Sequence, residues 1–158
     1  MTAFKSIFFL FLVPGLLMGY FPYLISTTDM ELLSLGILSY LAFLLWLVGW
    51  AAMLWCLWNF TINGRGTPAP IDPPKELVAV GLYRFVRNPM YVAGLITLGG
   101  WILWSPSLPL IIAPILFFIA AHLFVTFYEE PTLKKKFGRA YGEYLKRVPR
   151  WIPKFTAR

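Results

Sequence analysis

Two adjacent acidic residues, Glu129 and Glu130, directly follow a long apolar run and are well suited to chemistry. A glutamate in such a place can hold an amine or another cationic group, and it can accept a proton. Arg84, Arg87 and Arg150 could each bind the carboxylate of a ligand through two parallel hydrogen bonds. An apolar segment gains nothing from two charges at its end, so we expect these blocks to build a site.

Aromatic and glycine residues near the same blocks extend this candidate site. Tyrosine and tryptophan rings stack on a purine or face a cation, and glycine lets the backbone approach a ligand closely. A ligand with an amine, a carboxylate, an adenine and a positive centre would use this whole set of groups. S-adenosylmethionine is such a ligand, although a dinucleotide would use many of the same groups.

The charged candidates also have purely structural explanations. Arg84 and Arg87 fit a role in binding lipid phosphate or in setting membrane topology. Glu129 and Glu130 fit a role at the N-terminus of the following helix, where a negative charge is favourable. Both explanations stay open beside the functional one.

The small and neutral candidates have structural explanations too. Gly94, Gly99 and Gly100 fit a close contact between helices. His122 lies seven residues before Glu129 and so shares its helix face, where a histidine with satisfied hydrogen bonds is common. An ionisable group inside an apolar span is nevertheless a functional candidate.

Several other chemistries lack the residues they need. The chain has no phosphate-binding P-loop and no Gly-x-Gly-x-x-Gly after a strand. It has one histidine, so we predict no metal site of the usual His/Cys type. His122 is the only possible base for a Ser-His-Asp arrangement, and no Gly-x-Ser-x-Gly stretch accompanies it.

The elements that position these residues are apolar. The 158 residues are 59% hydrophobic and 13% charged, against about 25% charged in soluble domains. We therefore predict an all-α polytopic membrane protein with four transmembrane helices. Their expected ranges are 6–25, 32–60, 89–104 and 108–128. The third, about 24 Å long, should form a tight hairpin with the fourth.

After Glu130 the pattern becomes that of a basic amphipathic helix, with apolar residues recurring at three- and four-residue spacing. We expect this helix on the cytoplasmic side, where it would also contact membrane lipids. The whole chain, 1–158, should be one domain, composed of two N-terminal spans (1–60), a cytoplasmic loop (61–88), a helical hairpin (89–128) and a cytoplasmic C-terminal segment (129–158).

Basic residues cluster in a way that predicts orientation. They precede the first apolar run, occupy the central loop and follow Glu130, whereas the connections near Asp29 and near Ser105 have none. This is a positive-inside pattern, so we expect both termini and the central loop in the cytoplasm. The same distribution argues against nucleic acid as the partner of the net charge of +7.

The charged blocks together resemble known families. Residues 81–91 resemble the central motif of the isoprenylcysteine carboxyl methyltransferase family, and so does the C-terminal stretch with Glu129-Glu130-Pro131, Tyr141, Tyr144 and Val148-Pro149-Arg150-Trp151. The segment from Asn88-Pro89-Met90-Tyr91 through Leu98-Gly99-Gly100-Trp101 to Tyr128-Glu129-Glu130-Pro131 also looks like the phospholipid N-methyltransferases. The resemblance covers about residues 77 to 153, half the chain.

The resemblance implies a membrane methyltransferase that moves a methyl group from S-adenosylmethionine to a lipophilic, membrane-resident acceptor. It implies Arg87 and Glu130 nearest the chemistry. The cofactor contacts that it implies are Arg87, Asn88, Pro89, Tyr91, Gly94, Gly99, Gly100, His122, Glu129, Glu130, Leu133, Tyr141, Tyr144 and Arg150. Prenylcysteine enzymes usually carry histidine in place of Asn88, which puts a prenylcysteine acceptor in doubt.

Three other functions stay open. The first is N-methylation of a phospholipid amine. The second is an NADPH-dependent membrane reductase, since sterol reductases look similar in the C-terminal region and Lys134, Lys135 and Lys136 could hold the 2′-phosphate. The third is a non-catalytic membrane scaffold. The acceptor and the oligomeric state cannot be read from the sequence.

Overall fold

The computed structural model describes residue 8 and residues 11–28, 32–64 and 74–155. Every regular element within these residues is a helix, which confirms the predicted all-α class. The first residues of the predicted span 6–25 and much of the loop 61–88 lie outside the described residues.

The N-terminal part of the bundle has two segments in line. A π-helix, η1, covers Phe11–Tyr20 and contains Pro14, and α2 covers Phe21–Ser26. Proline cannot donate the hydrogen bond of an α-helical turn. The wider π winding contains this residue without breaking the segment, and such winding is frequent near functional sites.

The second part is long and largely exposed. A short 3-10 helix, η2 (Gly36–Tyr40), leads into α3 (Leu41–Ile62). Leu44, Leu47 and Leu54 are exposed on α3. An apolar helix with an exposed apolar face is suited to contact with lipid chains.

The predicted hairpin is formed by α4 (Pro89–Trp104) and α5 (Leu108–Phe124), joined by a turn at 105–107. Proline stands at the first turn of each helix, where its missing N–H group costs nothing. The bounds of α4 are those expected from the sequence. A side chain at Gly49 of α3 would collide with Thr97 of α4, so glycine permits the close contact of these two helices.

The chain continues from α5 without a loop. A π-helical turn, η4 (Val125–Glu129), connects α5 to α6 (Glu130–Arg147). Gly138 breaks α6 into two parts, because its φ of 53° lies in the left-handed region that favours glycine. The second part can therefore turn back towards the bundle.

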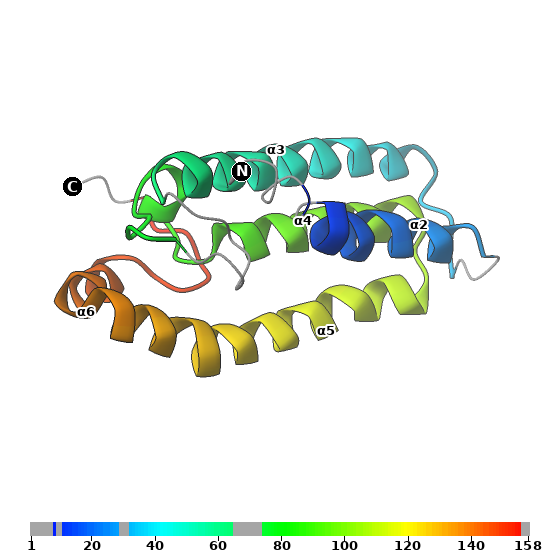
Figure 1. Ribbon diagram of the computed structural model, residues 1–158. Helices are drawn as coiled ribbons and strands as arrows, with labels where there is room; N and C mark the ends of the chain where they lie inside the picture. The colour runs from blue at the N-terminus through cyan, green and yellow to red at the C-terminus, as the bar shows by residue number, and fades with distance from the viewer. Residues whose placement is uncertain (1–7, 9–10, 29–31, 65–73, 156–158) are drawn as a thin grey trace.

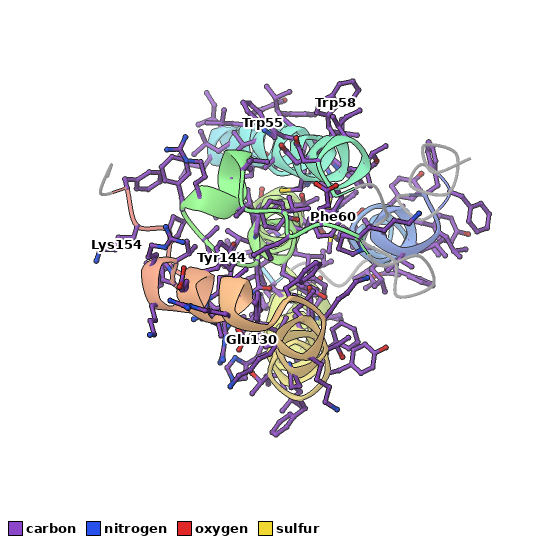
Figure 2. All side chains as sticks on the ribbon, turned by 60° about the vertical axis from the view of Figure 1, so that its left-hand side comes forward. Trp55, Trp58, Phe60, Glu130, Tyr144 and Lys154 are labelled. Atoms are coloured by element: carbon purple, nitrogen blue, oxygen red, sulfur yellow. The ribbon has the colours of Figure 1, made fainter. Side chains whose placement is uncertain are left out.

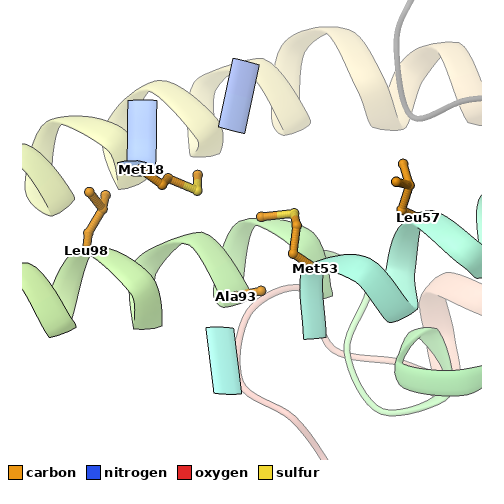
Figure 3. Packing of buried hydrophobic residues seen from close by; sticks show 5 residues of the cluster. All are labelled: Met18, Met53, Leu57, Ala93 and Leu98. Atoms are coloured by element: carbon orange, nitrogen blue, oxygen red, sulfur yellow. The ribbon is translucent and has the colours of Figure 1, made fainter. Parts of the chain in front are cut away.

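The helices pack around α4. In Figure 1 and in the end-on view of Figure 2, α4 lies between α3 and α5, and η1 with α2 lies beside it. Figure 3 shows the buried cluster at their meeting point, which contains Met18, Met53, Leu57, Ala93 and Leu98.

Two helical stretches are long and apolar enough to cross a membrane, namely Gly36–Ile62 and the stretch Leu108–Arg147 with its apolar first half. Two further apolar helices, Phe11–Ser26 and Pro89–Trp104, are shorter. These lengths fit an integral membrane protein. The count of four spans, the multi-pass arrangement and the cytoplasmic position of the termini remain predictions.

Candidate functional site

The charged blocks meet at one end of the bundle. A short 3-10 helix, η3 (Gly81–Arg84), precedes α4 there, and the end of η4, the start of α6 and residues 148–154 lie beside it. Figure 2 looks onto this end, with Glu130 near the junction of α5 and α6 and Tyr144 pointing between α6 and the remaining helices.

Glu130 is the centre of an ion-pair network. Arg87 donates from Nη1 to Oε1 at 2.7 Å. Arg150 donates from Nε to Oε1 at 2.9 Å and from Nη2 to Oε2 at 2.7 Å. Such paired, charge-assisted bonds are the strong class of hydrogen bond. With 14% of its side chain exposed, Glu130 joins the start of α4, the start of α6 and the C-terminal segment.

Residues 148–154 run alongside residues 85–88. Arg87 donates from its backbone N–H to the carbonyl of Pro149 and from Nε to the carbonyl of Val148, at 2.9 and 2.8 Å. Asn88 donates from Nδ2 to the carbonyl of Arg150 at 3.1 Å. A residue that precedes proline avoids the helical region, so Asn88 stays outside α4 and can make this contact.

Glu129 has a different environment from its neighbour. Its Oε2 accepts a hydrogen bond from the Tyr91 hydroxyl at 3.3 Å, and no ion pair between described residues includes it. The side chain is half-buried. Burial raises the pKa of this carboxyl to about 7, because its charged form is costly until a positive group reaches it. Glu129 is therefore a candidate ligand for a cation.

Two adjoining cavities meet at these residues. The apolar chamber is lined by Val13, Pro14, Met18, Met53, Met90 and Tyr91. The polar pocket is lined by Pro74, Leu77, Val78, Glu130, Leu133, Phe137, Tyr141 and Tyr144. Both cavities share Phe60, Tyr83, Arg87, Asn88 and Glu129. The shared residues therefore form a junction between an apolar and a polar space.

Aromatic residues form the wall of the polar pocket. Tyr141 and Tyr144 are buried and pack with Leu77 and Val148. The Tyr144 hydroxyl donates to the carbonyl of Tyr83 at 2.8 Å. Burial raises the pKa of the Tyr83 hydroxyl well above its usual value, so this group stays neutral in the junction.

His122 lies outside both cavities. Its Nδ1 accepts a hydrogen bond from Nε1 of Trp151 at 3.1 Å, which assigns the proton of a neutral ring to Nε2. Phe118 also packs on Trp151, with ring centroids 5.1 Å apart. The histidine thus fixes the C-terminal segment against α5 in this structure.

The glycines of α4 contact other helices. A side chain at Gly94 would collide with Met18, and one at Gly100 would lie 2.6 Å from the Trp46 ring. Gly99 has only a methyl group of Leu45 nearby, at 3.7 Å. Gly94, Gly99 and Gly100 line neither cavity, and Gly100 lies about 16 Å along α4 from Pro89.

The remaining predicted residues gather at the junction. Arg87, Asn88, Tyr91, Glu129, Glu130, Leu133, Tyr141 and Tyr144 line one or both cavities, while Pro89 begins α4 and Arg150 binds Glu130. Phe60, Tyr83, Met18 and Met53 also line the cavities but are absent from the predicted set. Tyr83 stands within the Gly81–Arg84 motif, which was a signal for it. Met18, Met53 and Phe60 lie in the first two predicted spans, which contain no motif.

Comparison with known proteins supports the family resemblance. A model of the phospholipid methyltransferase family matches residues 37–140. The chain is also 34% identical over 85 residues to Protein-S-isoprenylcysteine O-methyltransferase B of Arabidopsis thaliana, an alignment that covers 49% of this chain and 40% of that relative. The chain thus matches less than half the length of this curated relative. No solved structure matches.

Proposed function

The chain belongs to the phospholipid methyltransferase family, and from this premise we propose that it transfers a methyl group from S-adenosylmethionine to a lipophilic, membrane-resident acceptor. The observation that carries the proposal is the junction between the two cavities. A group-transfer enzyme has to hold a polar cofactor and an apolar acceptor with their reacting atoms in contact. A polar pocket and an apolar chamber that share five lining residues meet this need.

The polar pocket has groups that suit two parts of S-adenosylmethionine, its positive charge and its purine. The carboxylate of Glu129 has no cationic partner among the described residues and is available to a positive group. Phe137 and Tyr141 offer aromatic faces for a purine. When bound, S-adenosylmethionine supplies a methyl group on a sulfonium, and the chemistry is the cofactor's own.

The side chains at the junction have separate roles in this proposal. Glu130 and Arg87 position the C-terminal segment and the start of α4, because both carboxylate oxygens of Glu130 are bonded to arginines. Glu129 contacts the cofactor or accepts a proton from an amine acceptor. The sequence placed Arg87 and Glu130 nearest the chemistry; the structure favours Glu129 for direct contact and the other two for positioning.

The apolar chamber holds the acceptor and excludes water. Met18 comes from η1, together with Val13 and Pro14, whereas Met53 comes from α3 and Met90 from α4. An apolar chain in this chamber would bring its polar head to Tyr91 and Glu129. Oriented binding of this kind lowers the entropic barrier to transfer.

A specific observation favours an amine over a carboxylate as the methyl acceptor. Glu129 lines the chamber with no ion pair among the described residues, whereas Arg87, which also lines the chamber, is paired with Glu130. A carboxylate acceptor would be repelled by Glu129, and an ammonium group would be attracted. Between the two candidate acceptors, we therefore favour a phospholipid amine over a prenylcysteine-like carboxylate.

Binding of S-adenosylhomocysteine and of NADPH to the detergent-purified protein tests the proposal. We expect calorimetry to show micromolar binding of S-adenosylhomocysteine and none of NADPH. Glu129→Gln should lose most of this binding, and Glu143→Gln, the same change on the outer face of α6, should keep it. Binding of NADPH alone would favour a reductase, and binding of neither ligand would favour a scaffold.

Transfer of a labelled methyl group to added lipids then identifies the acceptor. We expect label in phosphatidylethanolamine rather than in a farnesylated cysteine derivative. Label in the farnesylated compound alone would reject the amine and keep the methyltransferase.

A further inference from the structure

A basic groove lies outside the site, on the same end of the molecule. We define it by four cationic residues, Arg84 of η3, Lys146 and Arg147 at the end of α6, and Lys154 of the C-terminal segment. The groove measures about 600 Å³ and is floored by Ala79, Tyr144 and Val148. Three chain segments thus bring four positive charges to one concave surface.

Among the described residues, no ion pair joins a carboxylate to a cation of the basic groove. All four side chains are exposed. The ion pairs between described residues join Arg87 and Arg150 to Glu130 and Arg139 to Glu143, and none of these lines the groove. Like charges in a concave surface raise the local potential and attract an anion.

The backbone fixes the shape of the groove. Lys154 donates from its backbone N–H to the carbonyl of Phe85 at 3.0 Å, and the rings of Phe85 and Phe155 lie 5.4 Å apart. These contacts hold the C-terminal segment beside η3. In Figure 2, Lys154 lies at the outer edge of this segment, away from the helices.

Two exposed apolar side chains flank Lys154 of the basic groove in the sequence. Ile152 is 80% exposed and Phe155 is 76% exposed, on either side of Lys154 in the chain. Contact with these apolar side chains would not stabilise a bound soluble anion. It would stabilise a bound lipid, because the phosphate would meet the cations while the acyl chains cover the apolar side chains.

We propose that the basic groove binds the phosphate of an anionic phospholipid, with the acyl chains of that lipid against Ile152 and Phe155. The bound lipid neutralises the four cations and anchors the C-terminal segment at the membrane surface. Charge complementarity and the two exposed apolar side chains both select this occupant over a neutral lipid.

Native mass spectrometry of the delipidated protein tests this site with phosphatidylglycerol as the probe. The groove variant carries Arg84→Gln, Lys146→Gln and Lys154→Gln. The matched control carries Lys134→Gln, Lys135→Gln and Lys136→Gln, which removes the same charge elsewhere on α6. We expect the groove variant to lose at least about tenfold in affinity, since each cation near the headgroup adds to its attraction.

Three results would decide against the proposal. An equal loss in the control variant would show diffuse attraction to the basic surface. Equal affinity of the wild-type protein for phosphatidylcholine would show that the net charge of the lipid headgroup does not affect binding. Competition by millimolar inorganic phosphate, with no contribution from Ile152→Ser and Phe155→Ser, would show a site for a free anion. Thermal unfolding checks that each variant is folded.

Discussion

The polar pocket and the apolar chamber share five residues but are held together by different forces. The polar pocket depends on directional bonds, in which Arg87 and Arg150 fix Glu130 and the C-terminal segment. The chamber depends on the packing of Met18, Met53 and Met90 from separate helices. Charge-assisted bonds tolerate little change, whereas methionine adapts to many shapes. This difference would suit the proposed function, in which one constant cofactor meets a variable acceptor.

Removal of an arginine from the polar pocket should have the largest effect. Arg87→Ala removes one of the two arginines bound to Glu130 and the bond from Nε to the Val148 carbonyl, so we expect a loss of stability of about 3 kcal/mol and no binding of S-adenosylhomocysteine. Thermal unfolding in detergent and calorimetry measure the two effects. Arg139→Ala, which breaks an exposed ion pair, should change neither; an equal loss there would contradict the role given to the pocket.

Replacing each glutamate by glutamine should distinguish the role of Glu129 from that of Glu130. Glu130→Gln weakens three charge-assisted bonds and should cost about 1 to 3 kcal/mol of stability. Glu129→Gln removes a charge that lacks a cationic partner, so it should leave the unfolding temperature unchanged or higher, while affinity for S-adenosylhomocysteine falls by about tenfold or more. The two roles would have to be exchanged if Glu129→Gln unfolded the protein and Glu130→Gln did not.

Loss of the contact between Trp151 and His122 should have a moderate effect. Trp151→Phe keeps an aromatic ring but removes the hydrogen bond to Nδ1, at a cost of about 1 kcal/mol. We expect S-adenosylhomocysteine to bind several-fold more weakly, because the C-terminal segment is less well fixed. His122→Gln, which keeps an acceptor for the Trp151 N–H group, should lose less affinity than Trp151→Phe. An effect of His122→Gln as large as that of Glu129→Gln would instead support direct contact with the cofactor.

Substitutions in the chamber should have the smallest effect on the cofactor. Met18→Leu and Met53→Leu keep the volume of the side chain and should change stability by less than about 1.5 kcal/mol. Affinity for S-adenosylhomocysteine should stay the same within error, while the preferred length of the acceptor chain shifts. A labelled-methyl assay with acceptors of graded chain length measures this preference. If the preferred chain length of the acceptor did not change, the proposal that the acceptor binds in the apolar chamber would be wrong.

The bounds of helices followed from sequence where proline marks them. Pro89 and the turn around Pro106 fixed α4 and the start of α5, and both helices begin as expected. Uniformly apolar runs contain no residue whose position indicates where a helix begins or ends. The π-helical winding of η1 and the contribution of Phe60 to the junction depend on tertiary packing, which no periodicity reveals.

The site was predictable as a set of residues but not as a set of partners. The motifs named Arg87, Glu129, Glu130 and Arg150 together, and the structure brings them to one place. Two adjacent glutamates are chemically identical in a sequence, and only their helix faces decide which one binds the arginines. The break at Gly138 could not be predicted either, because Phe137-Gly138 within a helical pattern does not indicate a positive φ.

The two arginines that bind Glu130 also determine when the polar pocket can form during synthesis of the chain. Arg87 and Glu130 leave the ribosome well before Arg150, which lies beyond α6. The residues of α3, α4 and α5 all precede it in the chain. The polar pocket can therefore form completely only after α6 has been synthesised, and we expect a chain cleaved between Arg147 and Arg150 to keep its helices but lose the two bonds from Arg150 to Glu130.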